Sequence, residues 1–405
     1  AQVVACDVSQ AVVDAINQGE TLIDEPGVAE LVRQAHADKK LRATTDTRAG
    51  VAECEVVVVI VPALLTSERD IDASILISVC HTLASALQPG AMVCFETTMP
   101  VGGTRRLLLP ALESAGRRAG VDFDLVFSPE RLKSRHVLER LPLTPKVVGG
   151  FDAKAAARAE RFYAQYLGAP VMNVGTLEAA EMVKLAGMVY RDVNIALANE
   201  LSRYAEATGV DIVSLAAAIN SDGEAALLQP GLGVGGHCTP VYPYFYIRDA
   251  QRLGVDAALA AHGRRINDAQ VAHVVDRLER ALPLSGRRVT ILGLAFRPDV
   301  KEHIFSPAFA LHEILRTRGA EVMLHDPLYT PAELSELGFT PSDLKSPADA
   351  LILHTAHSAY RELPFAELAK AGVRAFVDGR AACDGKAVRA AGIAYVGVGR
   401  PILES

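Results

Sequence analysis

The stretch EVVVVIVP, residues 55–62, decides the fold class. Its apolar and mostly β-branched residues do not alternate with polar ones, which is typical of a strand buried on both faces of a parallel sheet. Comparable runs occur in QVVACD (2–7), AMVCFETT (91–98), FDLVFSP (123–129) and KVVGGF (146–151), and a helical pattern from Gln10 to about Asn17 follows the first. The sequence therefore predicts an α/β fold, mostly doubly wound, with helices on both faces of the sheet.

The same pattern returns after a helical centre. Residues 176–208 form one helical segment that ends at Gly209 and would be about 50 Å long at 1.5 Å per residue, a length that often joins domains. Another helical stretch covers Arg264 to Leu282. Strands then restart in RRVTILGLAF (287–296), AEVMLHDP (320–327), ALILHTA (350–356) and RAFVDGR (374–380), with a helix from Pro307 to Thr317. We therefore expect two Rossmann-like domains, residues 1–175 and 284–405, joined by a central helical region, residues 176–283.

Length and charge exclude several classes of protein. The 405 residues suffice for two or three domains with cores of their own. With 41 Lys+Arg against 48 Asp+Glu and no basic block, the chain predicts no surface for nucleic acid. Its longest apolar run, 56–61, is far shorter than the roughly 20 residues of a membrane span, and residues 1–10 do not read as a signal peptide. Six scattered cysteines without CxxC pairs predict reduced thiols in a cytoplasmic protein and no metal site.

Asp7 closes the first short strand and precedes a helix. This is the place of the acid that binds a ribose hydroxyl in dinucleotide-binding folds. That acid usually follows a GxGxxG turn by about 20 residues, and only six residues precede it here. We therefore expect the first strand and its glycine turn to be missing from this chain, either by truncation or by loss of the turn. An ordinary turn residue is the alternative interpretation of Asp7.

The segment QPGLGVGGHCTPVYPYFYI, residues 229–247, carries the strongest signal for chemistry. Gly231, Gly233, Gly235 and Gly236 permit positive φ and let backbone amides approach a ligand closely. Cys238 follows them and is a candidate nucleophile for an aldehyde, because a helix end or a cation makes a thiolate reactive. A structural cysteine in a glycine-rich turn is the alternative.

Eleven stretches follow one another in a specific order. They are GETLIDEPGVAELV (19–32), LRATTD (41–46), VP (61–62), ETTMPVGGT (96–104), FSPERL (127–132), PKVVGG (145–150), EMVKLAGMVYRDVNIALANEL (181–201), PGLGVGGHCTPVYPYF (230–245), RRIND (264–268), GLAFRPD (293–299) and VDGR (377–380). Together they resemble the UDP-sugar dehydrogenase family, and within it the branch that acts on UDP-N-acetylhexosamines such as UDP-N-acetylmannosamine. The resemblance implies NAD as cofactor, a UDP-sugar as substrate and a homodimer built on the long helix.

The resemblance also implies a four-electron oxidation. A sugar 6-hydroxyl becomes an aldehyde, Cys238 captures it as a thiohemiacetal, and the thioester formed next is hydrolysed to a uronic acid. Lys184 would stabilise the oxyanion, Glu130 would handle a proton or activate water, and Thr98 would position that water beside the nicotinamide. From the residues alone, Lys184 could be a solvated lysine, Glu130 with Arg131 a surface pair, and Thr98 the end of a strand.

Binding residues follow from the same resemblance. Cofactor contacts are implied for Asp7, Val61, Pro62 and Thr98. Substrate contacts are implied for Glu130, Arg131, Lys184, Arg191, Asn194, Gly235, Gly236, His237, Arg264, Arg297 and Arg380. Arg297 replaces the usual lysine, and its planar fork binds phosphate differently from an ammonium. Arg380 could instead be a turn residue, and His237 could only shape its loop.

Three positions depart from the family pattern. Met188 replaces an asparagine one turn after Lys184 and cannot donate a hydrogen bond to the oxyanion. Tyr242 replaces the aspartate of a CxPxDP motif, and a phenol is not an anion near neutral pH. Ile304 and Phe305 replace the arginine and glutamate of an Arg-Glu-Ser element, which removes a cation expected near the cofactor. Such losses predict a slow enzyme or none, while the fold need not suffer.

Two classes of function therefore remain open. The leading expectation is an NAD-dependent 6-dehydrogenase of UDP-N-acetyl-mannosamine or -glucosamine. The alternative is a catalytically impaired homologue that binds a nucleotide sugar. A third possibility is the same reaction on UDP-glucose, TDP-glucose or GDP-mannose.

Overall fold

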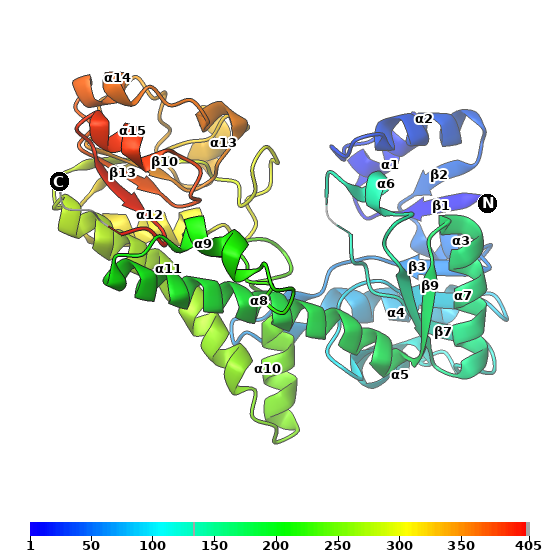
Figure 1. The fold of residues 1–405 in the computed structure, drawn as a ribbon. Coiled ribbons are helices and arrows are strands. Elements are labelled where there is room, and N and C mark those ends of the chain that lie inside the picture. Colours follow the sequence, from blue (N-terminus) through cyan, green and yellow to red (C-terminus); the bar gives the residue numbers. More distant parts are fainter. Residues whose placement is uncertain (133, 402–405) are drawn as a thin grey trace. The chain divides into compact units, whose positions relative to one another are not determined.

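The computed structural model describes residues 1–132 and 134–401 (Figure 1). The chain divides into two compact units. The first unit comprises residues 1–187 and 244–254, and the second comprises residues 188–243 and those from 255 onward. Each unit contains a five-stranded sheet, and the long helix α8 (Leu177–Thr208) contributes residues to both units.

The larger sheet of the first unit has the strand order β3-β6-β7-β8-β9. Its strands are β3 (Val56–Val59), β6 (Met92–Phe95), β7 (Asp124–Phe127), β8 (Lys146–Gly150) and β9 (Val171–Thr176). Every residue of β6 and β7 is buried, as the continuous apolar runs predict. One pairing departs from the predicted parallel sheet, because β7 and β8 run antiparallel. A parallel pair usually needs a helical crossover, whereas the described residues between these two strands, 128–132 and 134–145, hold only the four-residue helix α6 (Val137–Arg140).

Two glycines at the end of β8 allow the backbone to pack closely. A Cβ on Gly149 would lie 1.9 Å from the carbonyl oxygen of Thr176, and one on Gly150 would lie 2.3 Å from the amide nitrogen of Ala156. No side chain fits at either position. Helix α7 (Ala153–Leu167) and strand β9 therefore approach this strand end directly.

The remaining elements of the first unit are short. Strands β1 (Val3–Cys6) and β2 (Leu41–Thr44) form a separate parallel pair, and β4 (Leu64–Leu65) pairs antiparallel with β5 (Ile71–Asp72). The helices are α1 (Gln10–Asn17), α2 (Val28–Ala37), α3 (Thr47–Val51), α4 (Ser74–Ala86), the π-helix η1 (Thr104–Leu108) and α5 (Leu109–Leu112). Helix α1 covers the residues that the sequence predicts.

The sheet of the second unit has the order β11-β10-β12-β13-β14, and all its pairs are parallel. Its strands are β10 (Arg288–Leu292), β11 (Glu321–His325), β12 (Ala350–Leu353), β13 (Ala375–Asp378) and β14 (Ala394–Gly397). Strand β10 lies between β11 and β12, so the winding changes direction there. In open α/β sheets, ligands bind outside the carboxyl ends of the strands at such a point.

Helices surround this second sheet. They are α12 (Pro307–Thr317), α13 (Pro331–Glu336), the 3-10 helix η2 (Ser358–Tyr360), α14 (Phe365–Lys370) and α15 (Gly385–Ala390). Helix α12 spans the predicted residues, because Ser306 caps its first turn and Pro307 takes the first helical position.

The central part of the chain is helical, as predicted. It holds α8, α9 (Ile212–Ile219), α10 (Tyr242–Arg252) and α11 (Ala258–Ala281). Within the described residues, no helix combines the length and the apolar character that a bilayer span needs.

Candidate functional site

Cys238 lies in the second unit at the start of a helical turn. Its carbonyl oxygen accepts hydrogen bonds from the amides of Val241 (3.2 Å) and Tyr242 (2.9 Å), and Tyr242 is the first residue of α10. The half-buried cysteine therefore lies on the turn that leads into α10, and peptide dipoles at the start of a helix favour a nearby anion. This placement agrees with a nucleophilic cysteine.

The glycines ahead of Cys238 are required by neighbouring protein atoms. A Cβ on Gly235 would lie 2.6 Å from the Cβ of Phe296, and one on Gly236 would lie 3.0 Å from the Phe296 ring. Gly236 has φ +105°, and its amide donates to the carbonyl oxygen of Ile304 at 3.0 Å. The sequence predicted that these glycines admit a ligand. The structure shows that the loop after β10 packs against them, and their contact with a ligand stays a prediction.

The start of the glycine loop contacts the end of β13. The amide of Leu232 donates to the carbonyl oxygen of Gly379 (3.0 Å), and a Cβ on Gly231 would lie 3.1 Å from Nη1 of Arg380. The Arg380 Nε donates to the carbonyl oxygen of His354 at 2.7 Å, and burial lowers the pKa of this arginine to about 10. The guanidinium therefore lies beside the glycine loop with a fixed orientation, which suits it to bind an anion there.

Other predicted substrate residues of the second unit have different surroundings. Arg264 is buried and forms ion pairs with Asp192 (2.7 Å) and Asp268. The Asn194 amide holds the segment before the glycine loop through the Ala226 carbonyl oxygen (2.8 Å) and the Leu228 amide (2.9 Å). Arg297 pairs with Glu302 at 2.9 Å, while Arg191 and His237 are exposed.

Lys184 and Glu130 lie together in the first unit. The Lys184 side chain is only 7% exposed, and its Nζ donates to the carbonyl oxygen of Glu130 and lies 3.7 Å from Glu130 Oε2. Lys184 is therefore buried rather than solvated. The Glu130 carboxylate is half exposed and accepts from the amide of Leu132. Thr98 is buried just after β6, and Arg131 is exposed.

Glu181, which the sequence interpretation did not single out, holds the segment after Thr98. Its fully buried carboxylate accepts hydrogen bonds from the amides of Gly102 (2.5 Å) and Thr104 (2.8 Å). Burial raises the pKa of Glu181 to about 7. The signal in the sequence was an acid three residues before Lys184, a spacing that places both on one face of a helix.

The segment after FSPERL is attached to the GETLIDEPG motif. The Glu25 carboxylate accepts hydrogen bonds from the amides of Arg135 and Val137, the latter at 2.8 Å, and the Arg135 guanidinium pairs with Asp24 at 2.5 Å. These contacts join two motifs that are more than 100 residues apart in the sequence. They fix residues 135–137, which lie shortly after Glu130 in the sequence.

The geometry of both units agrees with a comparison of the sequence with protein families. Residues 1–167 match the NAD binding domain of the UDP-glucose/GDP-mannose dehydrogenase family, residues 178–269 match its central domain, and residues 290–385 match its UDP binding domain. The chain belongs to the UDP-glucose/GDP-mannose dehydrogenase family. Members of this family are oxidoreductases that act on nucleotide sugars with NAD.

Relatives in this dehydrogenase family align along most of the chain. A UDP-N-acetyl-D-mannosamine dehydrogenase from Salmonella typhi is 31% identical over 387 residues, which cover 90% of each chain. The solved structure of a UDP-D-ManNAc dehydrogenase from Pyrococcus horikoshii has a TM-score of 0.90 at 31% identity, with 98% of this chain and 94% of that chain covered. An NDP-N-acetyl-D-galactosaminuronic acid dehydrogenase from Methanosarcina mazei Go1 has a TM-score of 0.86 at 28% identity, with 98% and 90% covered.

The residues of the first unit fit NAD, the cofactor of this dehydrogenase family. Asp7 follows β1 directly, and its Oδ1 accepts a hydrogen bond from the Ser9 amide at 2.8 Å, which holds the carboxylate at a strand end where it can accept from a ribose hydroxyl. Val61 and Pro62 come shortly after β3, and Thr98 after β6. These are the carboxyl ends of parallel strands, where dinucleotides bind.

The structure shows where the residues lie that depart from the dehydrogenase pattern. Met188 is half-buried on α8, one turn beyond Lys184. Tyr242 begins α10, and Ile304 offers its carbonyl oxygen to Gly236. Phe305 has φ +50°, a left-handed conformation that is uncommon for an aromatic residue.

Proposed function

We propose that this dehydrogenase oxidises C6 of UDP-N-acetyl-mannosamine or UDP-N-acetyl-glucosamine to the uronic acid, with NAD as oxidant. The observation that carries the proposal is Cys238 on the turn that leads into α10, after glycines where an added Cβ would crowd neighbouring protein atoms. The names of two relatives support the sugar, since the proteins from Salmonella typhi and Pyrococcus horikoshii are both UDP-N-acetyl-D-mannosamine dehydrogenases.

The proposed reaction has two oxidations and one hydrolysis. NAD, when bound, accepts the hydride that leaves C6 in each oxidation. The Cys238 thiolate adds to the C6 aldehyde and forms a thiohemiacetal, and loss of the second hydride gives a thioester. Water then attacks the thioester carbon, which releases the carboxylate and restores the thiolate. Covalent capture retains the aldehyde between the two oxidations.

Three residues of the first unit have proposed roles in these steps. Lys184, a buried cation, stabilises the oxyanion that develops at C6. Glu130 is half exposed and next to this ammonium, so it can receive the hydroxyl proton and later activate the hydrolytic water. Thr98 orients that water beside the nicotinamide. In the second unit, Arg380, Arg297 and the glycine loop bind the nucleotide diphosphate.

The stoichiometry of NADH tests the proposal. The protein is incubated with NAD and with each of UDP-N-acetylmannosamine, UDP-N-acetylglucosamine, UDP-glucose, TDP-glucose and GDP-mannose. Two NADH per molecule of an N-acetylated sugar support the proposed reaction. Two NADH from one of the other sugars alone would assign a different substrate. Cys238→Ser should abolish formation of the uronic acid, and unchanged turnover would remove Cys238 from the mechanism.

A catalytically impaired binding protein is the second candidate. It is favoured by Met188, Tyr242 and Ile304, which replace groups that the family uses near the reacting carbon and the cofactor. Calorimetry measures binding of the UDP-sugar, and absorbance measures NADH. A silent homologue binds the UDP-sugar but produces no NADH. Restoring Met188→Asn and Tyr242→Asp together should then raise turnover.

We also propose a homodimer, a division into domains and a location. Tyr190, Leu197 and Tyr204 recur every seven residues on α8 and are 60%, 48% and 70% exposed, which leaves an apolar stripe for a second copy of the chain. The domain boundaries proposed are 1–175, 176–283 and 284–405, which the ranges of the three family domains support. A cytoplasmic location is proposed because the six cysteines are free thiols, which persist in a reducing compartment.

A further inference from the structure

A loop without regular secondary structure supports the glycines ahead of Cys238. This supporting loop, residues 294–306, follows β10 in the second unit. Phe296 lies against Gly235 and Gly236, and the carbonyl oxygen of Ile304 accepts from the Gly236 amide. Any shift of the supporting loop therefore moves the backbone two residues before the nucleophile.

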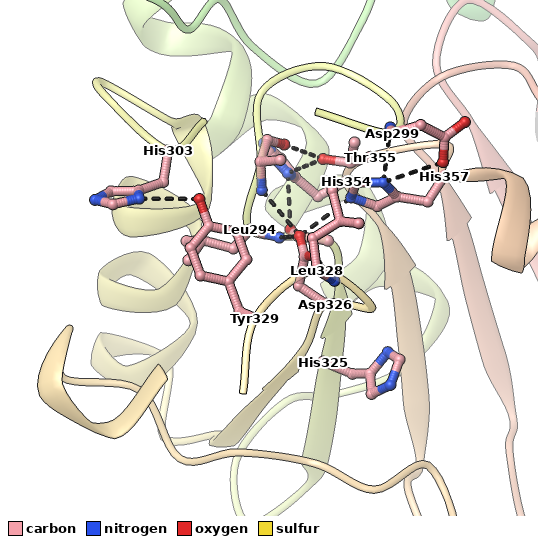
Figure 2. A network of polar contacts seen from close by, with 12 residues as sticks. Leu294, Asp299, His303, His325, Asp326, Leu328, Tyr329, His354, Thr355 and His357 are labelled. Atoms are coloured by element: carbon pink, nitrogen blue, oxygen red, sulfur yellow. Dashed lines mark hydrogen bonds and ion pairs between the residues drawn. The ribbon is translucent and has the colours of Figure 1, made fainter. Parts of the chain in front are cut away.

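A buried carboxylate holds the beginning of the supporting loop. Asp326 follows β11, and its fully buried Oδ2 accepts from the amides of Leu294 (2.7 Å) and Ala295 (3.1 Å). Its Oδ1 accepts from the Leu328 amide at 2.9 Å. Figure 2 shows Asp326 at the centre of this network, between the supporting loop and the segment after β12.

His357 connects the same carboxylate to the middle of the supporting loop. Its buried ring lies with Nε2 3.1 Å from Asp326 Oδ2, and its Nδ1 accepts from the Asp299 amide at 2.9 Å (Figure 2). Because a backbone amide only donates, Nδ1 is unprotonated, so Nε2 carries the hydrogen and donates to Asp326. Asp299 has φ +56°, a left-handed conformation that this contact helps to hold.

The segment that carries His357 contacts the supporting loop and Arg380. Thr355 Oγ1 donates to the carbonyl oxygen of Ala295, and the His354 carbonyl oxygen accepts from Arg380 Nε at 2.7 Å. Burial lowers the pKa of His354 to about 3, so this imidazole is neutral and its Nδ1 can donate to the Gly293 carbonyl oxygen at 2.9 Å. Residues 354–357 therefore touch both the nucleophile support and a proposed substrate arginine.

We propose that His357, held by Asp326, is a positioning residue that sets the location of Cys238 through the supporting loop. The inference rests on the proposed function of Cys238 as nucleophile. His357 does not touch the substrate in this scheme. It fixes Asp299, while Asp326 fixes Leu294 and Ala295, so that Phe296 and Ile304 present a defined surface to Gly235 and Gly236.

Three variants separate the two contacts of the His357 ring. His357→Asn keeps an acceptor near the position of Nδ1 and loses the donor to Asp326. His357→Gln keeps a group that reaches Asp326 and loses the acceptor for Asp299. His357→Ala loses both contacts. Ser358→Ala is the matched control, because it removes only the exposed hydroxyl that donates to Asp299 Oδ1 at 3.0 Å.

The first measurement follows the rate at which iodoacetamide modifies the Cys238 thiol, read by mass spectrometry of its peptide. Cys383, half-buried in the same unit, serves as the internal reference for general loosening. We expect the rate at Cys238 relative to Cys383 to change by about fivefold or more in the Ala variant, by less in Asn and Gln, and not in Ser358→Ala. This readout requires no turnover.

The second measurement counts products of turnover with the N-acetylated sugar. A displaced thiol captures the aldehyde poorly, so the His357 variants should release aldehyde that hydroxylamine traps, and should lose about tenfold in kcat with KM within twofold. His357 variants that fold, keep the native modification rate at Cys238 and release no aldehyde would overturn the proposal. If the native protein makes no NADH, the proposed function fails, and the modification rates still decide the role of His357.

Discussion

The titration of Glu181 makes stability depend on pH in a calculable way. The folded protein holds this carboxylate without solvent exposure, and burial raises its pKa from the ordinary 4.5 to about 7. Between these two pH values, the folded protein binds more protons at Glu181 than the unfolded chain does. The contribution of Glu181 to stability is therefore fully present below pH 4.5 and is lost as the pH rises through 7.

The magnitude follows from the two pKa values. At roughly 1.4 kcal/mol per pH unit, the loss between pH 5 and pH 8 amounts to about 2–3 kcal/mol. Glu181→Gln removes the titration and keeps one acceptor for the amides of Gly102 and Thr104. The free energy of unfolding of this variant, minus that of the native protein, should therefore increase by about 2–3 kcal/mol from pH 5 to pH 8.

Urea unfolding followed by far-ultraviolet circular dichroism measures this difference at several pH values. Glu178→Gln is the control on the same helix. The hydrogen bond from Arg105 lowers the pKa of Glu178, so its contribution is lost as the pH falls, with the opposite sign. If the native and Glu181→Gln curves stay parallel from pH 5 to pH 8, the assignment of a raised pKa to Glu181 is wrong.

Three further predictions concern the site and the assembly. Gly236→Ala should destabilise the second unit by about 1–3 kcal/mol, because φ is +105° and the new Cβ meets Phe296, and urea unfolding measures this. Lys184→Met should reduce kcat by about a hundredfold or more with the fold retained, and an unchanged rate of NADH formation would refute its role. Leu197→Asp should convert the proposed dimer to a monomer in sedimentation, whereas a persisting dimer would place the interface elsewhere.

The sequence predicted most strands of the two five-stranded sheets because their apolar runs are strong local signals. Helix α12 agrees at both ends, since Ser306 and Pro307 mark its start and Arg318 and Gly319 follow its end. The antiparallel pairing of β7 and β8 was not predictable, because apolar runs report burial and not strand direction. Strand β14 was missed, since its four residues lie beside glycines that weaken the strand signal.

The candidate site was predictable where one segment carries the chemistry. Cys238, Lys184 and Glu130 lie in motifs that predict their roles, and these roles stay predictions, while the structure does bring Lys184 and Glu130 together. The residues that hold the supporting loop were harder to predict. Asp326 and His357 contact residues that are 30 or more positions away in the sequence, at the ends of separate strands. No periodicity joins such residues in a sequence. Buried carboxylates that accept backbone amides are recognisable only once the strands are assembled.

The contact of Phe296 with Gly235 and Gly236 limits how the protein can be re-engineered. A glycine loop transplanted from another dehydrogenase would need the supporting loop of the same protein as well, because a larger residue in either loop would collide with the other loop. Substitutions at these two places are thus expected to be coupled, and libraries that randomise them separately would discard combinations that work. Transfer of substrate preference between homologues should succeed with both segments exchanged together.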